Sequence, residues 1–257
     1  MTKIYSIISG KGGVGKTTCT VNLGSSLNKL GKDVIIVDCN LTTPNLGIHF
    51  GAPIVPITLN HVLNNQARIE DAIYEHEYGT KVVPASLSIK ETERIDYRKI
   101  PEILNKLRKF TNYVLVDSAA GLGEEARISL LSADEIIIIT NPEISAVTDA
   151  LKTIKHAEEY NKPVKGVIIT RYRGKRTEMS LMNIKDMLEV PILGLIHEDE
   201  AIKESQVYKN SVVYTHPKSA AAKGFIEIAR RILGENIPVK TNYHSVFSGL
   251  LRVVGIK

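Results

Sequence analysis

Residues 10–17 read GKGGVGKT, a glycine-rich turn that matches the pattern G-x-x-x-x-G-K-[ST]. A short apolar run, residues 4–8, precedes the turn, and a helix-like stretch, residues 16–30, follows it. In this setting the N–H groups of the turn and the positive end of the helix form a cradle for a phosphate group. A turn that binds nothing is the alternative, but it explains neither the lysine nor the threonine. The feature requires a buried strand joined to a helix, and so an α/β fold.

The rest of the chain repeats this alternation of apolar runs and helix-like stretches. Several runs are continuous, which is typical of strands buried on both faces; they span residues 34–37, 82–83, 114–116, 136–139, 167–169 and 192–196. Helix-like stretches span residues 101–108, 124–132, 145–160, 177–188 and 219–233. We predict one α/β domain, residues 1–233, with a doubly wound, mostly parallel sheet flanked by helices. Residues 234–244 are predicted to be a linker, because glycine, proline and polar residues follow the last helix.

The glycine-rich turn predicts ATP and Mg²⁺ as cofactors. Its glycines let the backbone adopt conformations that are closed to other residues. Lys16 is expected to meet the β- and γ-phosphates, and the Thr17 hydroxyl is expected to bind Mg²⁺. We assign nucleotide binding to the whole turn, namely Gly10, Lys11, Gly12, Gly13, Val14, Gly15, Lys16, Thr17 and Thr18.

Two carboxylates follow apolar runs and are candidates for the magnesium site. Asp117 ends the run 113–116, and Asp38 ends the run 34–37. An acidic residue at the end of a strand beside such a turn is placed to hold Mg²⁺ and its water shell. The alternative for each is a strand-end aspartate that caps a turn.

Composition limits the cellular setting and the kinds of partner. No apolar run approaches the roughly 20 residues that cross a bilayer, and no signal peptide is recognisable. Cys19 and Cys39 form no CxxC pair, so we expect small packing residues in a reduced, cytoplasmic compartment. The net charge of +5 and the pI of about 9.0 are compatible with simple solubility or with attraction to nucleic acid or lipid headgroups.

A second lysine in the turn, Lys11, gives the full pattern KGGxxGK[ST]. In this the chain resembles the deviant Walker A ATPases of the MinD/ParA family. The resemblance implies a homodimer that sandwiches ATP: Lys16 holds the nucleotide of its own subunit, and Lys11 reaches the nucleotide of the partner, like an arginine finger given in trans. Both lysines are therefore candidate catalytic residues. The alternative for Lys11 is a solvated loop lysine.

Several stretches along nearly the whole chain are most similar to the MinD branch of that family, which regulates cell-division sites. They are residues 44–47, 117–122, 140–143, 147–150 and 170–172. The same resemblance gives candidate base contacts, namely Thr170, Arg171, His197, Glu198 and Asp199. The alternatives are a strand-end threonine and an acidic helix start. Branches that bind iron–sulfur clusters fit worse, because neither cysteine lies in a cluster motif.

The chain departs from these relatives at Asn40, where they typically carry the second aspartate of a D-x-D pattern; here the residues are Asp38-Cys39-Asn40. An asparagine cannot accept a proton as a base, although it can orient a water molecule by hydrogen bonding. We therefore expect slow hydrolysis and a long-lived ATP dimer. A slow-hydrolysing adaptor, in which bound ATP holds a dimer for another protein, remains an alternative.

The last 13 residues, 245–257, read SVFSGLLRVVGIK. Most of their apolar side chains fall within an arc of roughly 160° on a helical projection. The segment resembles the C-terminal membrane-targeting helix of MinD, which implies a helix that lies on an anionic membrane. Its cations, Arg252 and Lys257, are few, so one copy should bind weakly and an ATP dimer with two copies strongly. The alternative is a terminal helix or strand that packs back on its own domain.

These observations predict an ATP-dependent, dimerising ATPase switch, peripherally and reversibly associated with the membrane, that positions other, unidentified proteins. The second hypothesis, from a different class, is a ParA-like partition ATPase that binds DNA non-specifically. Residues 171–176 (RYRGKR) would supply its phosphate contacts, with four cations in six residues. A solvated loop is the alternative for that run. The tail favours lipid over DNA.

Overall fold

The computed structural model of the chain describes residues 2–92 and 95–239. The predicted tail, residues 245–257, lies outside the described residues, as do residues 240–244 of the predicted linker. Residues 234–239 follow the last helix without helix or strand structure.

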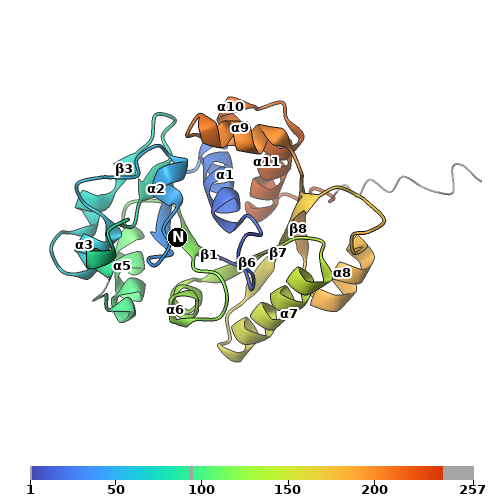
Figure 1. Cartoon of the computed structure of the whole chain (residues 1–257), viewed down its shortest axis with the longest axis horizontal. Coiled ribbons are helices and arrows are strands. Elements are labelled where there is room, and N and C mark those ends of the chain that lie inside the picture. Colours follow the sequence, from blue (N-terminus) through green and yellow to red (C-terminus); the bar gives the residue numbers. More distant parts are fainter. Residues whose placement is uncertain (1, 93–94, 240–257) are drawn as a thin grey trace, which may run out of the picture.

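An eight-stranded sheet forms the centre of the molecule (Figure 1). Its strands lie in the order β3-β4-β2-β5-β1-β6-β7-β8; β3 runs antiparallel to β4, and the other neighbouring pairs are parallel. The bounds are Lys3–Ile8 (β1), Val34–Cys39 (β2), Tyr74–Glu75 (β3), Lys81–Val83 (β4), Tyr113–Ser118 (β5), Glu135–Thr140 (β6), Val164–Tyr172 (β7) and Ile192–His197 (β8). The predicted doubly wound, mostly parallel sheet is confirmed, and each predicted apolar run lies in a strand.

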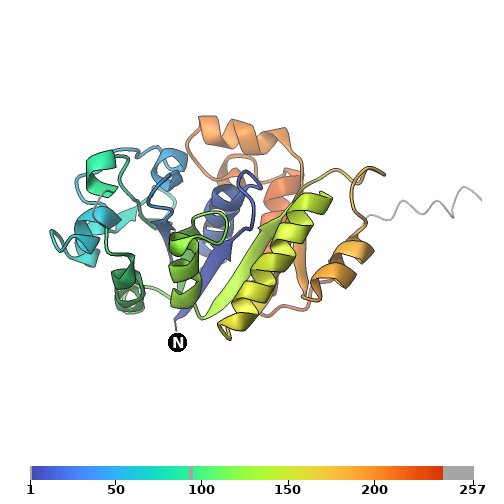
Figure 2. The same ribbon diagram turned by 60° about the horizontal axis from the view of Figure 1, so that its bottom comes forward.

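Helices cover both faces of the sheet. On one face lie α3, α5, α6, α7 and α8, and on the other α1, α9, α10 and α11; Figure 2 shows α6, α7 and α8 in front of the sheet with α1 and α11 behind it. The bounds are Lys16–Lys29 (α1), Leu46–His49 (α2), Leu59–Leu63 (α3), Ile89–Thr92 (α4), Ile100–Leu107 (α5), Glu124–Ser132 (α6), Ile144–Glu159 (α7), Leu181–Leu188 (α8), Glu200–Val207 (α9), Val212–Thr215 (α10) and Ala220–Ile232 (α11), with short 3₁₀ turns at Ile69–Ala72 and Tyr97–Lys99.

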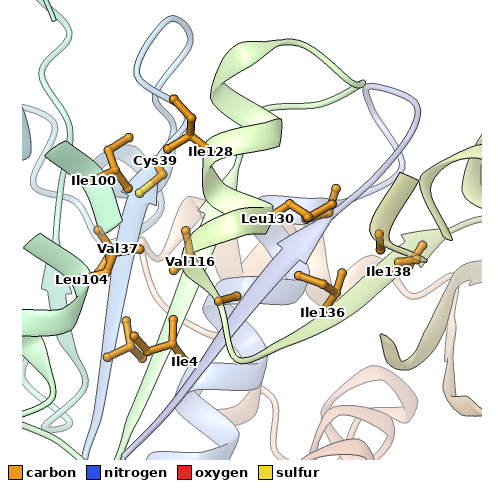
Figure 3. Packing of buried hydrophobic residues seen from close by; sticks show 14 of the residues in the cluster. Ile4, Val37, Cys39, Ile100, Leu104, Val116, Ile128, Leu130, Ile136 and Ile138 are labelled. Carbon is orange, nitrogen blue, oxygen red and sulfur yellow. The ribbon is translucent and has the colours of Figure 1, made fainter. Parts of the chain in front are cut away.

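The central strands are buried because both of their faces pack against helices. In Figure 3, for example, Val37 and Val116 of adjacent strands meet Ile100 and Leu104 of α5. The continuous apolar runs of the sequence reflect this two-sided burial. A polar side chain at the carboxyl end of a central strand therefore lies at the edge of the core, beside the loops that lead from the strands into the helices.

One predicted helix begins later than expected. We predicted a helix over residues 177–188, but α8 begins at Leu181. The Ser180 hydroxyl accepts the N–H of Asn183 and caps the helix. Residues 175–178 instead form a turn, closed by a hydrogen bond from the Glu178 N–H to the Lys175 backbone oxygen. The Glu178 carboxylate also accepts backbone N–H groups of the preceding loop.

Candidate nucleotide site

The glycine-rich turn connects β1 to α1 and leaves an open concave surface. Gly13 and Gly15 have φ angles of 77° and 90°, in the region that favours glycine. A Cβ atom added at Gly12, Gly13 or Gly15 would meet no heavy atom within 4 Å. The turn therefore has room for a phosphate group on the side where its glycines lie.

Gly10 differs from these glycines, because it packs tightly against α7. A Cβ atom at Gly10 would lie 2.4 Å from the backbone oxygen of Asp149. No side chain fits there without movement of the turn or of the helix.

A Gly10→Ala variant is therefore expected to lower the free energy of unfolding by about 1–3 kcal/mol, the usual cost of overpacking. Gly12→Ala is the matched control, because the added methyl group enters open space; we expect a change within about 0.5 kcal/mol. Urea titration of both variants measures the difference. Equal stability of the two variants would contradict this account of Gly10.

Asp117 lies at the centre of the site, at the end of β5. It is fully buried and accepts hydrogen bonds from the hydroxyls of Thr17, at 2.6 Å, and Thr20, at 3.2 Å. The ammonium group of Lys16 lies 3.4 Å from the same carboxylate. The lysine and the threonine of the turn therefore both contact the predicted acidic residue. Thr20 is a member of this cluster that the sequence pattern did not predict.

Asp38 lies beside Asp117, since the two residues are register partners on β2 and β5. Its carboxylate accepts the N–H groups of Asn40, Asn45 and Leu46 at 3.0–3.2 Å, and so holds the loop after β2. Burial, together with the neighbouring Asp117 carboxylate, raises the pKa of Asp38 to about 7. A cation beside Asp38 would favour the ionised form of its carboxylate.

The donor groups of this cluster fit Mg²⁺. The ion prefers hard oxygen ligands and keeps several waters, so one or two carboxylates and a hydroxyl suffice beside the phosphates of a nucleotide. Thr17, Asp38 and Asp117 offer such oxygens. Within residues 2–92 and 95–239, no group of three or more histidine, cysteine, aspartate or glutamate side chains is arranged to hold a metal on its own. The oxygens of Thr17, Asp38 and Asp117 suit a metal that also binds the phosphates of a nucleotide.

Asn40 faces the phosphate loop across a pocket of about 340 Å³ that both line. Its side-chain amide donates to the backbone oxygen of Thr43 at 2.6 Å, and its Oδ1 accepts the Thr43 hydroxyl at 3.0 Å. His49 also lines this pocket, and burial lowers its pKa. The sequence offered no signal for His49, which only the short helix α2 brings to the site.

A second pocket, of about 490 Å³, adjoins the first and shares Gly15, Thr18 and Arg171 with it. The structure brings all five candidate base-contact residues to the wall of this second pocket: Thr170, Arg171, His197, Glu198 and Asp199. Val14, Gly15 and Thr18 of the predicted turn also line it. The rest of the wall was not predicted and comes from α1, β8, α9 and α11, namely Cys19, Ile196, Ile202, Lys203, Gln206 and Phe225. A helix that starts directly after residue 199 would have predicted part of this wall, because residues 202, 203 and 206 lie on one face of such a helix.

Two of the candidate base-contact residues also hold the surrounding structure. The Thr170 hydroxyl lies 2.7 Å from the backbone oxygen of Val14 and 3.0 Å from that of Thr140, so it ties the glycine-rich turn to the sheet. The Asp199 carboxylate accepts the N–H of Ala201, at the start of α9, and that of Ala221, at the start of α11. The polar groups of both side chains are engaged by the fold itself.

Lys11 points away from the phosphate loop of its own chain. Its ammonium group lies 3.5 Å from the carboxylate of Glu143 and 3.3 Å from the hydroxyl of Ser145, at the start of α7. The lysine side chain is 44% exposed. It is therefore open to a second molecule that covers this face.

The basic run, residues 171–176, folds onto acidic side chains. Arg173 forms an ion pair with Glu198. The backbone N–H groups of Arg173, Gly174 and Lys175 donate to the carboxylate of Glu178 at 2.9–3.3 Å. Two carboxylates thus neutralise part of the charge that the sequence showed.

The cysteines behave as the sequence predicted. Cys19 and Cys39 are free thiols and fully buried, and burial raises the pKa of both. A buried thiol of this kind serves as a small packing residue. Among the described residues, no helix has the length and apolar character needed to cross a membrane.

Comparison with known proteins places the site in context. The sequence profile of the CobQ/CobB/MinD/ParA nucleotide binding domain matches residues 5–212. An uncharacterized ATP-binding protein of Methanocaldococcus jannaschii is 37% identical over 229 residues, which cover 89% of this chain and 87% of that protein. The septum site-determining protein MinD of Thermotoga maritima is 32% identical over an alignment of 262 positions, which covers 98% of this chain and 95% of that protein.

Among solved structures, the septum site-determining protein MinD from Pyrococcus horikoshii, complexed with Mg-ADP, superposes with a TM-score of 0.87. Its sequence is 35% identical, and the match covers 92% of this chain and all of that one. Most of the chain therefore has a structural counterpart in that protein.

Proposed function

The chain belongs to the CobQ/CobB/MinD/ParA family of nucleotide-binding ATPases, and on that premise we propose that it is a MinD-like switch. In this proposal the protein binds Mg²⁺-ATP, dimerises around it, associates with an anionic membrane through residues 245–257, and leaves the membrane after hydrolysis.

The contact of Lys16, Thr17 and Asp117 carries the nucleotide part of the proposal. Lys16 would bind the β- and γ-phosphates in the pocket of about 340 Å³, and the base would occupy the adjoining pocket of about 490 Å³. Mg²⁺, when bound, neutralises charge on these phosphates. Asp117 orients both side chains of the turn toward that position, and Asp38 would complete the magnesium site.

The position of Lys11 supports the dimeric part of the proposal. The ammonium group is held at the start of α7 rather than at the phosphate loop of its own chain. A second copy that places its nucleotide against this face would receive the charge of Lys11. The stabilisation would then depend on dimerisation, as with an arginine finger given in trans.

The membrane part is tested by pelleting the full chain with anionic liposomes, in Mg²⁺-ATP and in Mg²⁺-ADP. We expect pelleting in ATP that exceeds pelleting in ADP, because two linked tails bind about 10²–10⁴-fold more tightly than one. A chain that ends at Val239 keeps every described residue and should not pellet. Leu250→Glu places a charge on the apolar face and should abolish pelleting, whereas Ser248→Glu, on the opposite side, is the matched control.

Pelleting that persists without the tail would contradict membrane binding through residues 245–257. Equal pelleting in Mg²⁺-ATP and in Mg²⁺-ADP would contradict the proposal that membrane binding depends on the nucleotide. Co-sedimentation of the protein with DNA tests the alternative function, non-specific DNA binding through residues 171–176. Arg173 forms an ion pair with Glu198, and Glu178 binds the backbone of the same loop, and both contacts weaken the case for DNA.

An Asn40→Asp variant is expected to hydrolyse ATP at least about tenfold faster than the parent, since a general base contributes about 10²–10⁴-fold. Asn45→Asp is the matched control: it makes the same change in the same loop, and both amides donate to the Thr43 backbone oxygen. Phosphate release at saturating Mg²⁺-ATP gives the rates. An Asn40→Asp variant no faster than the parent would rule out Asn40 as the cause of slow turnover.

A further inference from the structure

An apolar groove of about 1150 Å³ lies between α8 and the start of β8, at one end of the sheet. Figures 1 and 2 show α8 beyond α7 at this end of the molecule. Met182 is 60% exposed there and lies beside other apolar side chains of the groove. The apolar wall consists of Leu181, Met182, Val190, Pro191, Ile192 and Val239.

The described chain ends inside this groove, because its last residue, Val239, belongs to the apolar wall. Arg231 holds the segment that leads into the groove. Its guanidinium donates to the backbone oxygen of Leu193 on β8, at 2.9 Å, and to those of Ile237 and Pro238, at 2.8 and 2.9 Å. The segment before Val239 is thus tied to the edge strand, and the rest of the polypeptide starts from the groove.

Charge complementarity favours residues 245–257 as the occupant. The groove carries two acidic side chains, Asp186 and Glu189, and one basic one, Lys185. Residues 245–257 contain two cations, Arg252 and Lys257, and no acidic side chain. Their apolar face also matches the apolar wall, and a methionine such as Met182 adapts readily to the shape of a partner.

We propose that the apolar face of residues 245–257 docks in this groove of its own chain. Only residues 240–244 separate the segment from Val239, and five residues span at most about 18 Å. Such a short connection holds the segment at an effective concentration on the order of millimolar, so that a weak contact suffices. The groove then covers the apolar face of the segment until the segment binds another apolar surface instead.

The docking has a consequence for membrane association, because one apolar face cannot be in the groove and in a bilayer at once. With a segment–groove dissociation constant on the order of 100 μM, about ten chains would be docked for each free one. Opening the groove would then raise liposome affinity about tenfold. The docking does not depend on membrane binding, so a result that contradicts one of these two proposals leaves the other standing.

Tryptophan fluorescence tests the docking, since the chain contains no tryptophan. Phe247→Trp in the full chain, without nucleotide or lipid, should emit at shorter wavelength than a synthetic peptide of residues 240–257 with the same substitution. Adding Met182→Asp, which places a charge on the groove wall, should shift the emission to that of the peptide. Val207→Asp is the matched control, because Val207 is an exposed apolar side chain on α9, away from the groove.

Three results would overturn the proposal. They are an emission equal to that of the free peptide, a shift that survives Met182→Asp, and a shift that disappears on tenfold dilution, which would place the segment on another copy. Liposome pelleting of Met182→Asp against Val207→Asp supplies the second measurement, with the tenfold gain expected only for Met182→Asp. If no variant pellets, the membrane proposal fails while the fluorescence result still decides the docking.

Discussion

An Asp117→Asn variant is expected to bind nucleotide but to lose hydrolysis by about 10²–10³-fold, the size of effect seen when one preorganised electrostatic group is removed. The substitution keeps the shape of the side chain but removes its charge. Lys16, only 8% exposed, then loses its ion-pair partner, and the Thr17 hydroxyl loses a charged acceptor. The proposed magnesium site also loses one of its two candidate carboxylates. Single-turnover phosphate release and a nucleotide-binding titration separate the two quantities.

Thr20→Val is the control for this prediction. The Thr20 hydroxyl donates to Oδ1 of Asp117 at 3.2 Å, the oxygen that Lys16 also faces. The variant therefore removes one hydrogen bond to Asp117 and leaves the charge in place. We expect a loss of hydrolysis of less than about tenfold. If Thr20→Val loses as much activity as Asp117→Asn, the cluster acts through packing of α1 against β5. If Asp117→Asn hydrolyses at the parental rate, Asp117 has no part in the metal site.

The sheet was predictable because its strands are buried on both faces, and two-sided burial leaves continuous apolar runs in the sequence. The strand β3 was not predictable, since it has only two residues and depends on two pairings, of Tyr74 with Val82 and of Glu75 with Lys81. The late start of α8 was missed for a local reason. Ser180 is the N-cap of that helix and has an extended backbone conformation, so the helix cannot continue into the residues before it.

The cluster of Lys16, Thr17 and Asp117 was predictable from the sequence, because the turn is contiguous and Asp117 follows an apolar run. The wall of the second pocket was not. Phe225 and Ile202 reach it only because α9 and α11 pack beside α1, and contacts over such a sequence separation leave no local pattern. Asp199 illustrates the limit: the sequence suggests a single acidic helix start, whereas its carboxylate binds the starts of two helices.

Lys11→Ala is expected to leave ATP binding by the single chain intact and to lower hydrolysis by about 10³-fold or more, the range of a charge supplied in trans. The ammonium group lies at Glu143 and Ser145 in the single chain, so its removal should not disturb the phosphate loop. Glu143→Gln is the control, because it removes only the exposed partner of the lysine. An exposed ion pair contributes about 0–1 kcal/mol, and we expect near-parental hydrolysis and stability.

Mixing two inactive variants distinguishes action in trans from action within one chain. Lys11→Ala subunits bind ATP but lack the first lysine, whereas Lys16→Ala subunits keep Lys11 and lack the lysine for their own nucleotide. If Lys11 reaches across a symmetric dimer, half of the dimers in an equal mixture contain one complete site, and about a quarter of the parental activity returns. A lysine that acts only within its own chain gives no recovery, since neither subunit then has both lysines at one nucleotide. Cross-linking establishes that mixed dimers form, so the absence of recovery in their presence would contradict the trans role of Lys11.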